Sequence, residues 1–154
     1  MACIFCQIAG GELPASIVYE DSECLAFMDI HPLGRGHVLV IPKHHARQVT
    51  ELETGATQRL FAVAESILSA QRRLGWGLDG SHILLNDGKT ANQKVPHVHV
   101  HIIPREKGDS LKSAGKLALH VTGVFGFATP RPRLEEQASQ LRTELLTQCN
   151  RRQT

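Results

Sequence analysis

Apolar and histidine residues alternate strictly in the segment 96–104, and this is the strongest pattern in the chain. The segment reads PHVHVHIIP. Successive side chains of an extended strand point to opposite faces, so the pattern predicts a strand with His97, His99 and His101 on one face. The other face carries Val98, Val100 and Ile102. Three imidazoles in a row are costly to desolvate and add little to packing, so we expect their face to carry chemistry.

Short runs rich in β-branched and aromatic residues predict four further strands, at 17–20, 24–28, 37–42 and 81–86. Between 54 and 74 apolar residues recur every three or four positions, which predicts an amphipathic helix ended by Gly75 and Gly77. Trp76 between them is expected to pack in the core or at its edge. The apolar spacing of Leu134, Ala138, Leu141 and Leu145 predicts a C-terminal amphipathic helix.

The order of these elements predicts an α+β fold. Strands dominate the first two thirds and follow one another through turns, with one long helix inserted, so we expect a five-stranded antiparallel sheet with helices on one side. The length of 154 residues and the hydrophobic content of 42% fit a single domain over 1–154. Its core is expected at 1–105, and the stretch from Arg105 to about Pro132 is expected to be a long surface segment.

Charge and apolar-run length narrow the class of protein. The formal net charge is +2 and 21% of residues are charged, so no basic patch for nucleic acid or a membrane surface is predicted. A small anionic ligand remains compatible with this charge. The apolar runs are short and the N-terminus lacks a basic stretch followed by an apolar one, so we expect no transmembrane helix, no signal peptide and a cytoplasmic location.

Cys3 and Cys6 form a C-x2-C pair, whose spacing suits two ligands of a tetrahedral zinc ion. Two more ligands must then come from elsewhere. A thioredoxin-like redox pair and plain thiols are the alternatives, and the redox interpretation is weaker because the pair does not follow a strand at the start of a helix. Lys43, His44 and His45 follow a predicted strand, which is a usual place for a site.

The histidine segment resembles the His-x-His-x-His-x-x signature of the histidine triad family of nucleotide hydrolases and transferases, in its Hint-like branch with a zinc-binding C-x2-C. The likeness extends through residues 3–6, 27–30 and 36–43, Asn86 and Gln93. The resemblance implies a homodimer in which two five-stranded sheets join. It also implies a site for the α-phosphate of a purine nucleotide.

The same resemblance assigns roles to individual residues. It implies that His99 is the nucleophile and that Asp29 binds the ribose. It also implies that Asn86 and Gln93 face the phosphate and that His37 helps to order the site. The catalytic set is then His37, Gln93, His99 and His101. The nucleotide-binding set is Asp29, Ile30, Asn86, Gln93, Lys94, His99 and His101, and the ligands of a structural zinc ion are Cys3, Cys6, His45 and His97. Two residues depart from the family pattern, namely Lys94 in place of a small hydroxyl residue and Asn92 in place of glycine.

The chemistry explains why a rigid histidine is needed. A neutral imidazole is a good nucleophile toward phosphorus, and an unperturbed pKa of about 6.5 leaves most of it unprotonated at neutral pH. The protein must give Nδ1–H of His99 a backbone acceptor, so that Nε2 carries the lone pair. Charge then builds on the phosphate oxygens, and donors from Gln93, Asn86 and His101 are expected to stabilise it.

Two other functions remain open from the sequence. In the first, His97, His99 and His101 together ligate a catalytic zinc ion, which would leave Cys3, Cys6 and His45 without a fourth ligand. In the second, the protein binds nucleotides as a regulator without catalysis. The nature of the leaving group also remains open.

Overall fold

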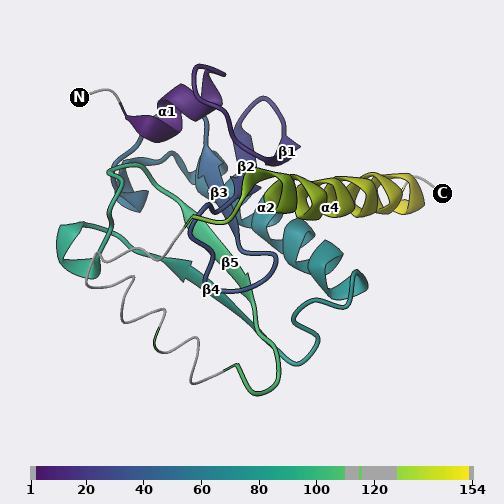
Figure 1. Ribbon diagram of the computed structural model, residues 1–154. Coiled ribbons are helices and arrows are strands. Elements are labelled where there is room, and N and C mark those ends of the chain that lie inside the picture. Colours follow the sequence, from purple (N-terminus) through teal and green to yellow (C-terminus); the bar gives the residue numbers. More distant parts are fainter. Residues whose placement is uncertain (1–2, 110–114, 116–127, 153–154) are drawn as a thin grey trace.

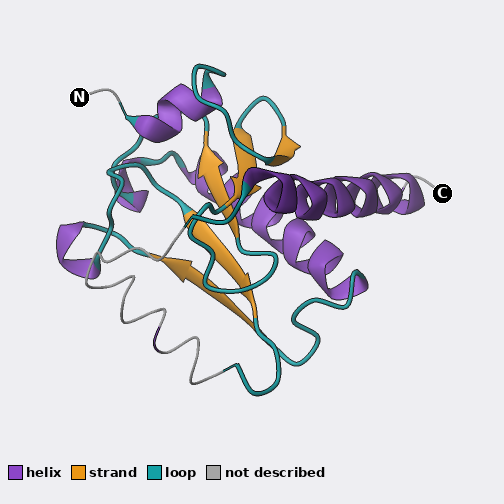
Figure 2. Ribbon diagram, viewed as in Figure 1, coloured by secondary structure: helices purple, strands orange, loops and turns teal. Residues whose placement is uncertain are grey.

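A computed structural model describes residues 3–109, 115 and 128–152, with side chains described up to residue 148. The chain forms one sheet with helices packed against it, as Figures 1 and 2 show. The helices are α1 (Ile4–Ala9), α2 (Thr54–Arg73) and α4 (Arg131–Arg152), with short 3-10 turns at Val49–Glu51 and Lys89–Ala91. The strands are β1 (Ile17–Glu20), β2 (Cys24–Met28), β3 (Val38–Pro42), β4 (Ser81–Leu85) and β5 (Val100–Pro104).

The five strands form one sheet in the order β1-β2-β3-β5-β4, and every neighbouring pair is antiparallel. The predicted five-stranded antiparallel α+β fold is therefore confirmed. β5 lies between β3 and β4, with His101 opposite Leu39 on one side and Leu84 on the other. This central place holds the end of the histidine segment on both edges.

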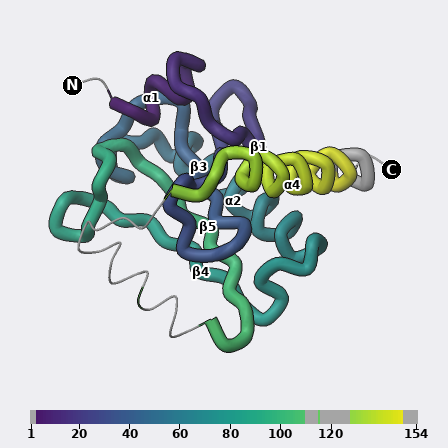
Figure 3. The backbone as a smooth tube through the Cα atoms, in the orientation of Figure 1, coloured from purple at the N-terminus to yellow at the C-terminus, as the bar shows by residue number. Residues whose placement is uncertain are grey.

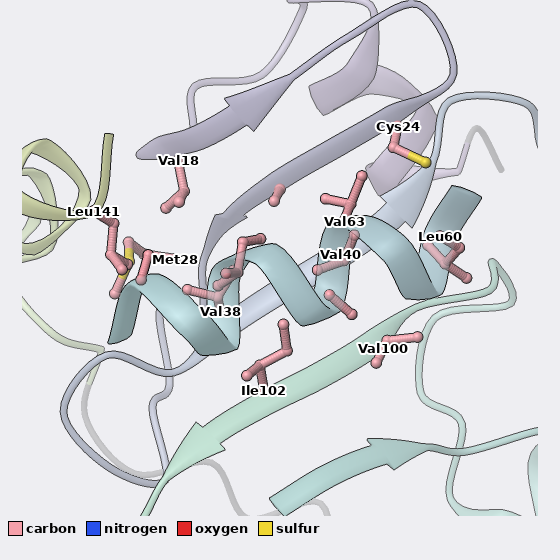
Figure 4. Close-up of a cluster of buried hydrophobic side chains, with 14 of the residues drawn as sticks. Val18, Cys24, Met28, Val38, Val40, Leu60, Val63, Val100, Ile102 and Leu141 are labelled. Carbon is pink, nitrogen blue, oxygen red and sulfur yellow. The ribbon is translucent and has the colours of Figure 1, made fainter. Parts of the chain in front are cut away.

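The two faces of the sheet carry different layers. Buried residues of β2, β3 and β5 pack with α2 and α4 into the larger core, and Figure 4 shows Val38, Val40, Val100 and Ile102 around α2. On the opposite face, Leu25, Phe27, Leu39 and Ile41 pack with Phe5 of α1 into a smaller cluster. The alternation in the sequence therefore separates a helix-covered face from the face that carries His99 and His101.

Two predictions about local structure were wrong. β5 begins at Val100 and not near residue 96, so His97 and His99 precede the strand. The N–H of Val98 bonds to the carbonyl oxygen of Ala46 at 2.8 Å, so the chain there pairs with a loop before it joins the sheet. The expectation that all helices lie on one side of the sheet was also wrong, because the unpredicted short helix α1 packs on the second face.

The two long helices agree with the prediction. α2 and α4 contact each other beside the sheet, and the salt bridge from Arg73 Nε to Glu144 Oε1 joins them (Figure 1). The apolar residues that predicted α4 pack into the core, with Leu134, Ala138 and Leu141 buried. α1 and the far end of α4 lie at opposite sides of the molecule (Figure 3). Most of the predicted surface segment lies outside the described residues.

The predicted absence of a membrane span can be compared with the helices. In the described part of the chain, no helix is both long enough and apolar enough to cross a bilayer. Trp76 is buried after the end of α2, as expected.

Candidate functional site

A cavity of about 410 Å³ opens on the histidine face of the sheet. One part of its wall is apolar and comes mainly from α1, the segment after it and the sheet: Ile4, Phe5, Ile8, Leu13, Phe27 and Leu39. The other part is polar: Asp29, His31, Asn86, Asn92, Lys94, His99 and His101. Ile30 also lines the cavity, although it is mostly exposed. The cavity can thus hold a molecule that has both apolar and polar groups.

His99 is oriented by its own backbone. Its Nδ1 lies 2.7 Å from the carbonyl oxygen of His97, which can only accept a hydrogen bond. Nδ1 therefore carries the proton, and the lone pair lies on Nε2. The Phe5 ring packs edge-on against the imidazole, with the ring centroids 5.2 Å apart. The backbone acceptor expected from the sequence is present.

A second chain of hydrogen bonds runs from the backbone to His101. The N–H of Leu33 donates to Nδ1 of His37 at 3.1 Å, so the proton of a neutral His37 lies on Nε2. Nε2 of His37 is 2.9 Å from Nδ1 of His101 and donates to it. The proton of His101 then lies on its Nε2, which makes this nitrogen a hydrogen-bond donor. His37 thus sets the tautomer of His101.

Asp29 lines the cavity and is buried. Its Oδ1 accepts the backbone N–H of His31 at 2.8 Å, and its Oδ2 is 3.5 Å from Nδ1 of His37. A buried carboxylate with acceptor capacity toward a cavity suits sugar hydroxyls. The ribose role of Asp29 stays a prediction.

Gln93 does not line the cavity in this structure. Its Oε1 accepts the N–H of Gly88 at 2.8 Å, and its Nε2 donates to the carbonyl oxygens of Arg47 at 2.6 Å and His97 at 3.3 Å. The last of these oxygens is also the acceptor for His99. Gln93 therefore holds the backbone carbonyl that orients His99, and the predicted phosphate contact of Gln93 remains a prediction. Asn86 and Lys94, the other phosphate candidates, line the cavity.

Four potential ligand atoms converge beside the cavity. They belong to Cys3, Cys6, His45 and His97 and lie within 4.8 Å of one another. Nδ1 of His97 is 3.5 Å from Sγ of Cys3 and 3.2 Å from Nδ1 of His45. The four residues predicted as zinc ligands therefore lie close together in the structure. Two thiols and two imidazoles are a donor set that suits tetrahedral zinc.

The protonation of this cluster also fits a metal site. Nε2 of His97 lies 2.8 Å from the carbonyl oxygen of Pro42 and donates to it, so the Nδ1 lone pair faces the thiols. Burial lowers the pKa of His97, and the charges of His45 and His99 lower it further, which favours the neutral form that a ligand needs. Burial and the neighbouring Cys3 raise the pKa of the Cys6 thiol. A bound cation would counter that rise.

The alternative in which the three histidines share one metal ion finds no support in their geometry. His97 directs Nδ1 to the thiols, whereas Nδ1 of His99 bonds to the backbone and Nδ1 of His101 to His37. Among the described residues, His97 and His101 fall into two separate groups of possible ligands, and His99 is in neither. The second group, Asp29, His37 and His101, is already organised by hydrogen bonds between the two imidazoles.

The contribution of α1 to the site was missed by the sequence analysis. Ile4, Phe5 and Ile8 line the cavity, and Phe5 contacts the rings of both His97 and His99. The signal in the sequence was the apolar residues Ile4, Phe5 and Ile8 around Cys6, which were interpreted only as part of a metal motif. Asn92, noted as a departure, also lines the cavity and has a left-handed backbone with φ 64°.

Curated relatives give this site a context. The chain is 44% identical to an uncharacterized HIT-like protein of Methanocaldococcus jannaschii, over 70% of this chain and 81% of that protein. It is 39% identical to the adenosine 5'-monophosphoramidase of Schizosaccharomyces pombe, over 68% of this chain and 75% of that protein. It is also 34% identical to an adenylylsulfatase of Arabidopsis thaliana, over 90% of this chain and 65% of that protein.

A solved structure agrees with these relatives. The crystal structure of a zinc-bound histidine triad family protein from Mycobacterium smegmatis matches with a TM-score of 0.77 and 37% sequence identity, covering 97% of each chain. The model of the HIT domain matches residues 10–108, which include all of β1 to β5 and the histidine segment. The chain therefore belongs to the histidine triad family.

Proposed function

We propose that the protein is a nucleotidyl hydrolase that uses His99 as its nucleophile. The observation that carries this proposal is the 2.7 Å hydrogen bond from Nδ1 of His99 to the carbonyl oxygen of His97, which leaves the lone pair on Nε2 at a residue lining the cavity. Without that bond the imidazole would exchange tautomers, and the nucleophilic nitrogen would be present only part of the time.

The reaction proceeds in two displacements. In the first, Nε2 of His99 attacks the α-phosphorus of the nucleotide, a P–N bond forms, and the bond to the leaving group breaks with its electron pair. In the second, water attacks the same phosphorus and the P–N bond breaks with its electron pair returning to Nε2. The nucleoside monophosphate then leaves, and His99 is regenerated. The Nε2–H of His101 donates to a non-bridging oxygen in both steps. One such donor is worth about 3 kcal/mol, or roughly a hundredfold in rate.

The division of the cavity supports a purine nucleotide as the substrate. The apolar wall from α1 and Phe27 suits the faces of a flat base. The Asp29 carboxylate can accept hydrogen bonds from ribose hydroxyls, and Asn86 and Lys94 offer donors to the phosphate. The ligand would thus lie with its base against α1 and its phosphorus near His99.

Zinc is the cofactor that the four-residue cluster fits. Cys3, Cys6, His45 and His97 would hold it, and with four protein ligands the ion is coordinatively closed and structural. Its contribution is to fix α1 against the segment before β5. Because α1 forms the apolar wall, we propose that zinc supports substrate binding indirectly and takes no part in the displacement itself.

The leaving group can be narrowed by experiment. The relatives named above act on an adenosine phosphoramidate in one case and on an adenylylsulfate in the other. Rates on these two compounds and on a diadenosine polyphosphate, measured side by side with the same enzyme, would rank an amine, sulfate and a second nucleotide as leaving groups.

The test of the proposal is a covalent label. Brief incubation with an adenine nucleotide labelled at the α-phosphorus, followed by acid-free quenching, should give a nucleotidyl adduct on the wild-type protein and none on His99→Ala. His82→Ala is the matched control, because His82 is an exposed histidine on β4 outside the cavity, and it should keep the adduct. An adduct that persists in His99→Ala, or turnover that survives there, rejects the proposal, and a non-catalytic regulator would give no adduct at all.

We further propose a homodimer joined through β4. This strand lies at an edge of the sheet, with Ile83 45% exposed, whereas the β1 edge is covered by α4 through the bond from Arg142 to the carbonyl of Ile17. An open edge with an exposed apolar residue favours strand pairing. Ile83→Lys should convert a dimer to a monomer in light scattering. The cytoplasmic location stays a prediction.

A further inference from the structure

Gly36, which precedes a residue of the site, is held from several sides. It has φ +76°, a left-handed conformation that glycine adopts easily, and a Cβ at this position would lie 2.6 Å from the Trp76 ring. Its N–H donates to Oε1 of Gln137 in α4 at 2.8 Å. Its carbonyl oxygen accepts Nε2 of Gln71 in α2 at 2.9 Å. Two side-chain amides, 35 and 101 residues away in the sequence, therefore fix the two peptide groups of one glycine.

The next residue connects this clamp to the cavity. His37 shares a peptide group with Gly36, is fully buried, and donates Nε2–H to His101. Its carbonyl oxygen accepts the N–H of Asp29 at 3.0 Å. A displacement of the Gly36 backbone therefore reaches both the donor of the site and its carboxylate. The other end of the 29–37 loop is tied to the same C-terminal segment, because the N–H of Thr129 donates to the carbonyl oxygen of Ile30 at 2.8 Å.

Burial indicates that the clamp has a purpose other than packing. Gln71 is fully buried, and its Oε1 has no hydrogen-bond partner among the described residues. A buried amide with one unsatisfied end destabilises the fold compared with an apolar side chain of similar size. What the amide does supply is a donor to the Gly36 carbonyl.

We propose that Gln71 and Gln137 are positioning residues that hold the 29–37 loop so that His37 fixes the tautomer and direction of His101, and that α4 is part of the support of the active site. The inference rests on the proposed function for its link to turnover. α4 lies outside the residues matched by the HIT domain, so this support is an addition to the matched core. α4 is anchored by the buried Leu134, Ala138 and Leu141, so loss of the Gln137 amide leaves the helix in place.

The decisive variants are at Gln137, in the zinc-loaded full chain. Gln137→Leu removes the acceptor for the Gly36 N–H, whereas Gln137→Glu keeps one. Gln140→Leu, one turn further along α4, is the matched control. With the adenosine phosphoramidate, kcat of Gln137→Leu should fall about tenfold, since the loop positions a group that acts in the transition state, and KM should rise by a smaller factor because Asp29 belongs to the same loop. Gln137→Glu should restore kcat to within about twofold, and Gln140→Leu should resemble the wild type.

A second readout does not depend on turnover. The ring nitrogens of His37 and His101 report their tautomers in ¹H–¹⁵N spectra, and Gln137→Leu should shift both while Gln137→Glu leaves them near their wild-type positions. If the wild type hydrolysed none of the nucleotides, the proposed function would fail, yet the shifts would still support the clamp. Unchanged spectra and unchanged kcat in Gln137→Leu would overturn it, as would an equal loss in Gln137→Glu or Gln140→Leu.

Discussion

His97 and His99 are two residues apart on one segment, yet they present opposite nitrogens. In His97 the Pro42 carbonyl occupies Nε2, so Nδ1 faces the thiols, whereas in His99 the His97 carbonyl occupies Nδ1, so Nε2 carries the lone pair. Each ring bonds to one backbone carbonyl, and the nitrogen that stays available makes His97 a candidate metal ligand and His99 a candidate nucleophile. The role of a histidine in this segment is therefore set by which of its two ring nitrogens bonds to a backbone carbonyl.

The largest effects are expected when each of these two rings is removed in turn. His99→Ala should lower kcat at least about a thousandfold, because it removes the nucleophile, and it should keep its zinc content and thermal midpoint close to the wild type. His97→Ala should lose zinc. Turnover by steady-state kinetics and metal by elemental analysis measure the two effects. Equal zinc loss in both variants would mean that His99 is also a ligand, contrary to the present assignment.

A smaller effect is expected at His37. His37→Leu keeps a buried side chain of similar volume but removes the hydrogen bond to Nδ1 of His101. The proton of His101 is then no longer held on Nε2, and kcat should fall about tenfold to a hundredfold. His82→Leu serves as control for the substitution on an exposed histidine. A His37→Leu protein with wild-type kcat and a changed thermal midpoint would show that the residue serves only the fold.

Removal of the two thiols tests the metal site without changing either histidine. Cys3→Ser combined with Cys6→Ser should release zinc and lower the thermal midpoint by about 10 °C, since a metal site that closes a loop contributes several kcal/mol to folding. The kcat should fall by only a few fold, with a larger rise in KM, because α1 lines the cavity and contains no reacting group. Cys149→Ser, outside the predicted ligand set, should retain zinc. Complete loss of turnover in a folded double variant would assign the metal to the chemistry.

The smallest effect on turnover is expected at a carboxylate that serves the fold alone. Desolvation opposes ionisation of Asp21, but hydrogen bonds from the N–H of Cys24 and from Arg59 lower its pKa to about 2. Ionised Asp21 therefore stabilises the fold above its unfolded pKa near 4, and this contribution is lost as the pH falls from about 4 toward 2.

Asp21→Asn should consequently lower the thermal midpoint by roughly 3 °C at pH 7, flatten its dependence on pH between 4 and 2, and leave kcat unchanged. Thermal melts across this range measure the effect. Asp79→Asn is the control, because the side chain of Asp79 is 64% exposed and its contact with Lys107 is long. A change in kcat would mean that the β1–β2 turn influences the cavity.

The sequence predicted the elements well where period and burial coincide. The five strands and two long helices follow apolar patterns of at least four residues, and the ends of α2 agree with its Gly-bounded stop. α1 escaped prediction because six residues show less than two turns of periodicity and Cys3 provides no side-chain cap. The start of β5 was wrong because Val98 bonds to the Ala46 loop, a partner that no local pattern encodes.

The same limit applies to the site. His99, His101 and the four cluster residues could be named because they stand in short motifs. The direction of each ring could not be predicted, because it depends on a single hydrogen-bond acceptor such as the Pro42 carbonyl, 55 residues from His97. Gln71 and Gln137 look like ordinary helix residues in the sequence, and only the folded chain brings their amides to Gly36.

The alternation at 97–102 has a consequence for how this chain can vary. Side chains of an extended segment alternate between two faces. One residue inserted between His97 and Val100 would therefore move the side chains on one side of the insertion to the opposite face. Imidazoles would then enter the apolar layer beneath α2, and valines would line the cavity. A change of one residue in the length of this short segment is therefore expected to destroy the site, even when every original residue is kept.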